Sequence, residues 1–368
     1  MTIGVLREGE GENRVVLLPE HVTSLAKKSI AVMVEKDAGV LSFASDQEYT
    51  DAGAKVGSRA DVIKGSDVIF SIHGPEDKIP KEKVLISVLG PLSNKSMVAH
   101  LAKSGVTSYS LDMIPRSTRA QAVDVLSSMA TVAGYKAVLV AASTLPNFFP
   151  MFMSSSGTIR PSRVLILGAG VAGLQALATA RKLGAVVEVF DVRTAVKEEV
   201  KSLGGKFVEV EGATDDSAAG GYAVEQSEEY KLKQGELIQE RAAGANVVIT
   251  TAQIPGRTAP VLIKKETVEA MKPGSVIIDL AASTGGNCEL TKNNETVIEH
   301  GVTIIGNSNL ASTMPSDASK MLGNNFLNFF GLMVGEDGNL NLDVDDEIVQ
   351  LTCITRNGEV VNERVKGA

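Results

Sequence analysis

The strongest chemical signal in the sequence is a glycine-rich turn within the segment RVLILGAGVAGLQALATARKLGAVVEVFD. An apolar run, Arg163–Leu167, leads into Gly168, Gly170 and Gly173, and a helical pattern follows. In such a turn the first glycine permits a tight bend and the third lets the helix pack on the strand. The second lets a pyrophosphate reach backbone N–H groups at the helix N-terminus. The spacing therefore predicts a dinucleotide site.

The acid that ends the next apolar run indicates which dinucleotide binds. Asp191 lies 18 residues after Gly173 (191 − 173), where a carboxylate can accept hydrogen bonds from both adenosine ribose hydroxyls. Its charge would repel a 2′-phosphate, so we expect NAD(H) rather than NADP(H), although the adjacent Arg193 weakens that argument. Turns after two later strands, TTAQIPG and DLAASTGGN, should border the same crevice, because parallel strands end at one edge of their sheet.

Composition and spacing exclude several other classes of function. The four His show no metal-ligand spacing, and the two Cys, far apart in the chain, make no disulfide framework. The 36 basic and 44 acidic side chains of the 368 residues give a net charge of −8 without a basic stripe, which argues against nucleic-acid binding. We find no secretory signal and no uninterrupted apolar window near the roughly 18 residues of a membrane span, so we expect no direct membrane insertion.

Apolar β-rich runs alternate with amphipathic helical patterns along the chain, which predicts α/β domains with parallel sheets. The expected strands are 3–6, 31–34, 68–72, 84–88, 106–111, 163–167, 186–190, 207–210, 246–250, 275–280 and 303–305. The expected helices are 19–28, 59–64, 95–103, 127–144, 172–183, 194–203, 225–242, 264–271 and 318–333. A hairpin-like stretch, 340–361, follows the last helix, and the helix 127–144 is expected to be mostly buried.

Chain order predicts a discontinuous first domain. We expect residues 1–126 and 309–368 to form an N-terminal α/β domain and residues 127–308 to form the dinucleotide-binding domain. The helices 127–144 and 316–333 should connect the two, with the phenylalanines of the second in the core between the domains, and a cleft there should hold the nicotinamide. The segment 212–223, GATDDSAAGGYA, is too polar and small to bury itself, so we expect a mobile loop.

The whole chain resembles the NAD(H)-binding domain I, in the alpha subunit, of the proton-translocating NAD(P) transhydrogenases, whose sister family is alanine dehydrogenase. The motifs that carry the resemblance are IGVLREGEGENRV, PRSTRAQAVDVLSSMATVAGYKAV, GAGVAGLQALATARKLGAVVEVFDVR, GGYA, TTAQIPGRTAPVLI and MKPGSVIIDLA followed by GGNC. The resemblance implies two Rossmann-like, doubly wound parallel-sheet domains. It also implies Si-Re specific transhydrogenase activity, in which hydride passes from NADH to NADP⁺ on a partner.

The resemblance also implies an assembly. It predicts a homodimer that associates with an NADP(H)-binding component and a membrane-spanning subunit, on the cytoplasmic or matrix-equivalent side and peripheral to the inner membrane through those partners. No acid or base is needed on this chain, because hydride transfer between nicotinamide rings moves no proton from water. Positioning and exclusion of water then carry catalysis.

The resemblance assigns site residues that pattern alone leaves as surface. The family's loop over the nicotinamide falls on Arg116, Gln121 and Asp124, with Ser127 following, and the mobile GGYA loop supplies Gly221 and Tyr222. The catalytic set is then Arg116, Gln121, Asp124, Ser127 and Tyr222. The cofactor-binding set is Arg116, Ser117, Thr118, Gln121, Gly168, Gly170, Val171, Ala172, Gly173, Asp191, Val192, Arg193, Gly221, Tyr222, Gln234, Thr251, Ala252 and Gln253, and no metal is expected. Gln253 stands where relatives commonly have Leu.

Two other functions fit the sequence less well. An alanine dehydrogenase needs a Lys, a His and an Asp at three motif positions, and this chain has His73, Leu89 and Ser283 there. A carboxylate substrate needs a cation and amine deprotonation needs a base, so the three replacements together argue against it. Arg14 is shared by both families and does not discriminate. A non-catalytic NAD-binding module would have little reason to keep the whole Arg116–Gln121–Asp124 set.

Overall fold

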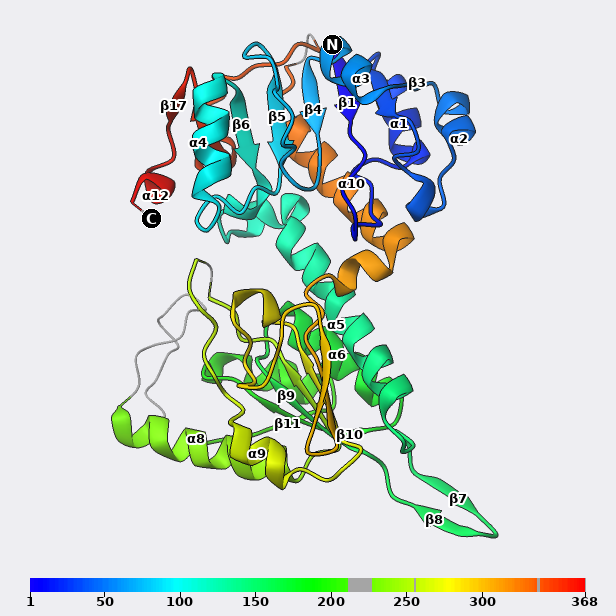
Figure 1. Cartoon of the computed structure of the whole chain (residues 1–368), viewed down its shortest axis with the longest axis vertical. Coiled ribbons are helices and arrows are strands. Elements are labelled where there is room, and N and C mark those ends of the chain that lie inside the picture. The colour runs from blue at the N-terminus through cyan, green and yellow to red at the C-terminus, as the bar shows by residue number, and fades with distance from the viewer. Residues whose placement is uncertain (211–226, 255, 336–337, 368) are drawn as a thin grey trace. The chain divides into compact units, whose positions relative to one another are not determined.

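The computed structural model describes residues 1–210, 227–254, 256–335 and 338–367. The chain divides into two compact units, residues 1–129 with 311–368 and residues 130–310. Each unit is built around one large twisted sheet flanked by helices (Figure 1). The fold class predicted from the sequence, two Rossmann-like parallel-sheet units, is confirmed.

Unit 1 holds an eight-stranded sheet in the order β17-β16-β6-β5-β4-β1-β2-β3. Its strands are β1 (Thr2–Val5), β2 (Ala31–Glu35), β3 (Lys55–Gly57), β4 (Val68–Phe70), β5 (Val84–Ser87), β6 (Thr107–Ser110), β16 (Cys353–Arg356) and β17 (Glu359–Val360). The first six are parallel, whereas β16 runs antiparallel to β6 and β17 antiparallel to β16. In chain order the parallel strands read 6-5-4-1-2-3, so the order reverses between β1 and β4, as in a doubly wound sheet.

Helices cover both faces of this sheet. They are α1 (Pro19–Ala26), α2 (Asp46–Asp51), α3 (Arg59–Gly65), α4 (Lys95–Ser104), α10 (Pro315–Gly331), α11 (Glu347–Thr352) and α12 (Glu363–Lys366). One core lies under α1, α2, α10 and α11, and the other lies under α3 and α4. Alternate residues of the strands enter opposite cores, as a pleated strand requires.

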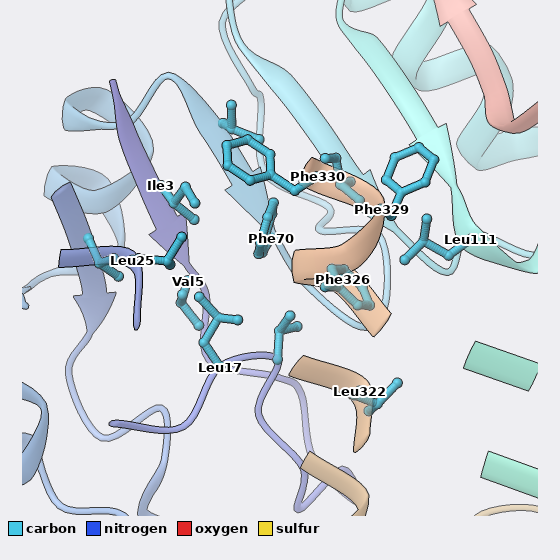
Figure 2. Close-up of a cluster of buried hydrophobic side chains, with 14 of the residues drawn as sticks. Ile3, Val5, Leu17, Leu25, Phe70, Leu111, Leu322, Phe326, Phe329 and Phe330 are labelled. Atoms are coloured by element: carbon cyan, nitrogen blue, oxygen red, sulfur yellow. The ribbon is translucent and has the colours of Figure 1, made fainter. Parts of the chain in front are cut away.

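Helix α10 packs its phenylalanines inside unit 1. The rings of Phe326 and Phe330 lie 5.5 and 5.7 Å from that of Phe70 on β4 (Figure 2). The ring of Phe329 lies 5.8 Å from that of Tyr109 on β6. Our expectation that this helix connects two domains and fills the core between them is wrong. The chain re-enters unit 1 at residue 311, and Leu322, Phe326, Phe329 and Phe330 of α10 belong to that unit's own core.

Unit 2 holds a seven-stranded sheet in the order β11-β10-β9-β12-β13-β15-β14. Its strands are β9 (Arg163–Leu167), β10 (Val186–Phe190), β11 (Lys206–Phe207), β12 (Val247–Thr250), β13 (Val276–Asp279), β14 (Thr296–Glu299) and β15 (Val302–Ile305). All are parallel except β14, which runs antiparallel to β15. The order reverses between β9 and β12, which makes this the switch point of the second sheet.

The sheet of unit 2 is also covered on both faces. Its helices are α6 (Val171–Lys182), α7 (Lys197–Ser202), α8 (Glu228–Ala243) and α9 (Lys265–Ala270), joined by most of α5 (Val125–Thr144). One core contains α5, α6 and α7, and the other contains α8 and α9. A separate hairpin of β7 (Phe152–Ser154) and β8 (Gly157–Ile159) projects from the unit (Figure 1).

Most elements fall where the sequence predicts, and the misses are short or exposed. The helices and strands not expected are α2, α11, α12, β3, β7, β8 and β14, and α11 lies within the stretch 340–361 that was expected to be hairpin-like. Strands β7 and β8 are exposed throughout, and β14 is only partly covered, so no buried apolar run signalled them. The turn-rich sequence of the β7–β8 region favoured a loop instead.

Helix α5 differs from expectation in two ways. It was expected to be mostly buried, but only 33% of its most apolar window is buried within this chain. Its 20 residues are also long and apolar enough to cross a membrane by length and composition, and it is the one such helix among the described residues. Counting uninterrupted apolar residues missed this, because Ser, Thr and Gly interrupt the run without lowering its mean hydropathy much. Core helices of soluble proteins have the same composition, and Ala137, Val138 and Ala141 are fully buried.

Candidate nucleotide-binding site

The glycine turn lies at the switch point of unit 2, between the end of β9 and the start of α6. Gly168 has a φ of +107°, which a side chain rarely tolerates, and a Cβ there would collide with the Thr251 hydroxyl. A Cβ at Gly173 would collide with the Gly168 carbonyl oxygen. The tight bend and the close helix packing predicted for these two glycines are therefore present.

Gly170, the second glycine of the turn, behaves differently. Among the described residues, no atom lies within 4 Å of the position that a Cβ at Gly170 would take, so packing within this part of the chain does not require the glycine. This residue is the N-cap of α6, whose first residues are Val171 and Ala172. Open space beside a helix N-terminus at a switch point suits a pyrophosphate, because the backbone N–H groups and the helix dipole favour an anion there.

Asp191 is directly linked to the glycine turn. One of its oxygens accepts a hydrogen bond from the Ala169 N–H at 2.6 Å, and the residue is 8% exposed. The carboxylate also receives the Arg193 side chain in a two-pronged contact at 2.9 and 2.8 Å, with the Arg193 N–H at 2.8 Å. The predicted ribose-binding acid thus lies at the turn, but its remaining oxygen positions are held by Arg193. Ribose hydroxyls would have to displace part of that contact.

The loop after β12 forms the other wall of the switch point. The Thr251 N–H donates to the Leu167 carbonyl at 2.9 Å, which holds this loop against the end of β9. The Gln253 side-chain amide donates to the Leu280 carbonyl at 3.0 Å, so it is directed towards the end of β13. Thr251 and Ala252 thus lie beside the glycine turn, as the sequence predicts from strand order.

The structure places another group of predicted site residues in unit 1. Arg116, Ser117 and Thr118 are exposed where the short helix η3 (Thr118–Val123) begins, and Gln121 is exposed within it. The loop is held by α10, because the side-chain amides of Asn325 and Asn328 donate to the Ala122 carbonyl at 2.9 and 3.0 Å.

Asp124 and Ser127 interact directly. The Asp124 carboxylate accepts the Ser127 N–H at 2.9 Å and the Ser127 hydroxyl at 2.5 Å. This pairing caps the first turn of α5, where a carboxylate satisfies backbone N–H groups. The capping contact gives these two residues a structural role beside the predicted one.

The remaining predicted residues stand apart. Gln234 lies half-buried on α8, and Val192 follows Asp191. Gly221 and Tyr222 lie outside the described residues.

Two residues that the sequence did not single out, Asp279 and Asn287, hold the crevice loops together, and only long-range contacts reveal them. Both thiols are buried, and burial raises the pKa of Cys288 and of Cys353 to about 11.

A cluster of charged residues occupies the switch point of unit 1, in which Glu12 and Arg14 are buried, Glu8 is half-buried and His73 is exposed. Glu8 accepts the N–H groups of Ile72 and His73 at 2.6 and 3.1 Å. Glu12 binds the Arg14 guanidinium at 2.7 and 2.5 Å, and its oxygen lies 3.1 Å from the His73 ring. Burial raises the pKa of Glu8. Burial also acts to raise the pKa of Glu12, but hydrogen bonds from Arg14 and His73 hold it well below its usual range.

The geometry therefore defines a chain of two Rossmann-type units, with a glycine turn at the switch point of the second. Two family models cover nearly its whole length: the alanine dehydrogenase/PNT N-terminal domain matches residues 4–133, and the C-terminal domain matches residues 137–363. The chain belongs to this alanine dehydrogenase/PNT family.

Individual relatives show which branch of the family is most similar. The chain is 44% identical to the first portion of NAD(P) transhydrogenase subunit alpha from Rhodospirillum rubrum, over 100% of this chain and 99% of that protein. It is 41% identical to NAD(P) transhydrogenase subunit alpha of Haemophilus influenzae, over 98% of this chain and 72% of that protein. An alanine dehydrogenase of Staphylococcus saprophyticus is 27% identical, over 100% of this chain and 96% of that protein.

Solved structures give the same ranking. The transhydrogenase of Sinorhizobium meliloti superposes with a TM-score of 0.90 at 40% identity, covering 98% of this chain and 100% of that one. An L-alanine dehydrogenase superposes with a TM-score of 0.82 at 24% identity, covering 100% and 98%, which shows a shared fold. The resemblance that the motifs carry is confirmed.

Proposed function

We propose that the chain is the NAD(H)-binding component of an NAD(P) transhydrogenase, and that hydride passes directly from its NADH to NADP⁺ on a partner subunit. The observation that carries the proposal is the hydrogen bond in unit 2 by which the Ala169 N–H, inside the glycine turn, donates to the Asp191 carboxylate. This bond links the predicted pyrophosphate-binding turn to the predicted ribose-binding acid. The identity of 44% to a transhydrogenase alpha subunit along the whole length supports the reaction.

The residues present fit a dinucleotide. Gly170 leaves space for the pyrophosphate at the start of α6, and Asp191 lies beside the same turn, where it can bind the adenosine ribose. NADH, when bound, supplies the hydride, and the balanced exchange leaves NAD⁺ here and NADPH on the partner. The chain's own residues bind and orient the nicotinamide, a task that we assign to Arg116, Gln121, Asp124 and Ser127 of unit 1. We propose that Gly221 and Tyr222 then exclude water.

The proposed assembly has three further parts: a homodimer, an NADP(H)-binding partner and a membrane-spanning subunit that couples transfer to proton movement. The β7–β8 hairpin supports the homodimer, because Met151, Phe152, Met153 and Ile159 are all exposed and Phe148 stacks on Phe152 at 5.5 Å. Such an apolar patch marks an interaction surface. Sedimentation should give twice the chain mass of 38.6 kDa, and a stable monomer would contradict the dimer. Proton uptake by vesicles that hold the reconstituted complex tests the coupling.

The direct test uses NADH that carries deuterium at the transferred position. With the partner component and NADP⁺, the label should appear in NADPH, and the chain should bind NADH at least about tenfold more tightly than NADPH, because Asp191 repels a 2′-phosphate. Label lost to water, or a preference for NADPH, would overturn the proposal. Pyruvate formed from alanine and NAD⁺ would favour an alanine dehydrogenase instead.

Gln121 offers a sharper probe of the unit 1 loop. Gln121→Ala should slow label transfer by about a hundredfold or more while changing NADH affinity little, because the residue is assigned to ring positioning. Gln47→Ala serves as the matched control, because Gln47 is a glutamine of unit 1 whose side-chain amide bonds Asp51, one turn further along α2. Equal losses of binding and transfer would show that Gln121 contributes to affinity alone.

A further inference from the structure

A fully buried carboxylate organises the turns at the carboxyl ends of β12 and β13. Asp279, the last residue of β13, has no exposed surface. It accepts hydrogen bonds from Thr250 Oγ1 at 2.9 Å, Ala281 N at 3.0 Å, Asn287 N at 2.7 Å, Cys288 N at 3.0 Å and Thr291 Oγ1 at 2.7 Å. Five donors to one carboxylate fix the loop that returns from residue 280 to residue 291.

The backbone that Asp279 fixes carries the side chain of Asn287, which reaches across to the loop after β12. Its Oδ1 accepts the Ala252 N–H at 3.0 Å, and its Nδ2 donates to the Ala252 carbonyl at 2.9 Å. The same Nδ2 donates to the Pro260 carbonyl at 2.8 Å. Asn287 is fully buried, and a side chain with both an acceptor and a donor is needed to bond both groups of one peptide residue.

Ala252 in turn borders the site. Its neighbour Thr251 is bonded to the end of β9, and the Thr251 hydroxyl lies where a Cβ of Gly168 would be. The loop therefore forms the β12 wall of the switch-point crevice. Asp191, which follows β10, belongs to the adenosine half, so the β12 wall faces the other half of a dinucleotide laid across the switch point.

We infer that Asn287, held in place by Asp279, is a positioning residue that sets the wall against which the nicotinamide half of the dinucleotide lies. The inference rests on the proposed NAD(H)-binding function. Asn287 acts through the Ala252 backbone, so its loss should displace the loop without touching the adenosine half of the site.

The test compares two asparagines that make the same kind of bond at opposite ends of the sheet. In Asn287→Ala the backbone N–H still donates to Asp279, but both bonds to Ala252 are lost. The control is Asn246→Ala, because the Asn246 Oδ1 accepts the Arg163 N–H at 2.9 Å at the opposite ends of β9 and β12. Affinities for NADH and for adenosine monophosphate are measured by calorimetry on both variants and the parent chain, together with thermal unfolding.

Asn287→Ala should weaken NADH binding by about tenfold or more, shift the fluorescence of bound NADH, and leave the affinity for adenosine monophosphate within about twofold. Asn246→Ala should lower the unfolding temperature while keeping both affinities. Parallel losses of the two affinities in Asn287→Ala, or no change in either, would overturn the inference. A parent chain that fails to bind NADH would instead remove the proposed function itself.

A milder variant covers the case in which Asn287→Ala does not fold. Thr291→Val is close in shape and removes one of the five bonds to Asp279. It should give the same selective loss of NADH affinity to a smaller degree, about two- to threefold. If Thr291→Val weakened adenosine monophosphate binding as much as NADH binding, the inference would fail.

Discussion

The parallel strands of the two units share one order, but the units differ at the place where that order reverses. In unit 2, α6 begins directly after the glycine turn, and Gly170 opens onto space. In unit 1, β1 also runs into a stretch with two glycines, Gly9 and Gly11, but α1 begins only at Pro19. The carboxylate of Glu8 there accepts the N–H groups after β4, at 2.6 and 3.1 Å.

This difference shows how one architecture can leave its switch point open in one unit and fill it with a carboxylate in the other. Backbone N–H groups at the carboxyl ends of parallel strands attract negative charge. In unit 1 the chain provides that charge through Glu8, with Glu12 and Arg14 neutralising each other nearby at 2.5 Å. In unit 2 the Asp191 carboxylate bonds the Ala169 N–H, and the space beside Gly170 suits a pyrophosphate. Strand order therefore sets where a site can form, and the side chains decide whether it stays open.

The largest expected effect comes from adding a side chain within the glycine turn of unit 2. Gly173→Ala places a Cβ against the Gly168 carbonyl, so α6 must move away from the pyrophosphate position. We expect NADH affinity to fall by about a hundredfold and stability to fall by about 1–3 kcal/mol. Calorimetric titration and thermal unfolding measure both.

Gly235→Ala on α8 is the matched control, because a Cβ there meets no atom of the described residues within 4 Å. It should stabilise the protein by up to about 1 kcal/mol, since alanine favours a helix over glycine. If Gly173→Ala bound NADH as tightly as Gly235→Ala does, the turn would not be the site.

A medium effect is expected at the filled switch point of unit 1. Glu8→Gln keeps one acceptor oxygen and presents an NH₂ group to the second backbone N–H, leaving that group unpaired. Unfolding in urea should show a loss of about 1–3 kcal/mol. NADH affinity should stay unchanged, and a tenfold loss would show that both switch points contribute to nucleotide binding.

The smallest effect concerns pH. The hydrogen bond with Glu12 raises the pKa of His73, although burial opposes it. Because folding raises the pKa of His73, its protonated ring stabilises the folded state. This stabilisation is complete below the ordinary pKa of about 6.5 and is lost as pH rises through the raised pKa. The ring is more than half exposed, so we expect less than about 1 kcal/mol.

Urea unfolding at pH 6 and pH 8.5 should therefore show a larger decrease for the parent chain than for His73→Gln. Identical decreases would mean that the contact between His73 and Glu12 does not change with protonation. NADH affinity in unit 2 should be unaffected by this substitution at either pH.

Short-range patterns predicted the parts of the site that lie close together in the chain. Gly168, Gly170 and Gly173 sit in one strand–turn–helix unit, and their conformations follow from it. The sequence correctly predicted that Asp191 lies at the glycine turn, because one helix and one strand of ordinary length separate the two in the chain. Its contact with Arg193 follows from adjacency, but the bond to Ala169 needed the folded sheet.

Other features depended on contacts that no local pattern encodes. Helix α10 was predicted as an apolar helix, but only the fold showed that its phenylalanines pack on β4 and β6 of unit 1. The sequence also did not predict that most of α5 is half-buried or exposed, because an apolar composition does not say what covers a helix. The β7–β8 hairpin was missed because every residue of its two strands is exposed, so no buried apolar run marks them.

The sequence by itself determined the α/β class, the glycine turn with its acid and the family of the chain, because each rests on residues near one another or on motifs read directly. The tertiary structure alone decided that Glu8 fills the switch point of unit 1 and that Asn287 bonds Ala252 in unit 2. The partners in those contacts lie 64 and 35 residues apart. Such pairs meet only when parallel strands bring their carboxyl ends to one edge, which depends on the order of the whole sheet.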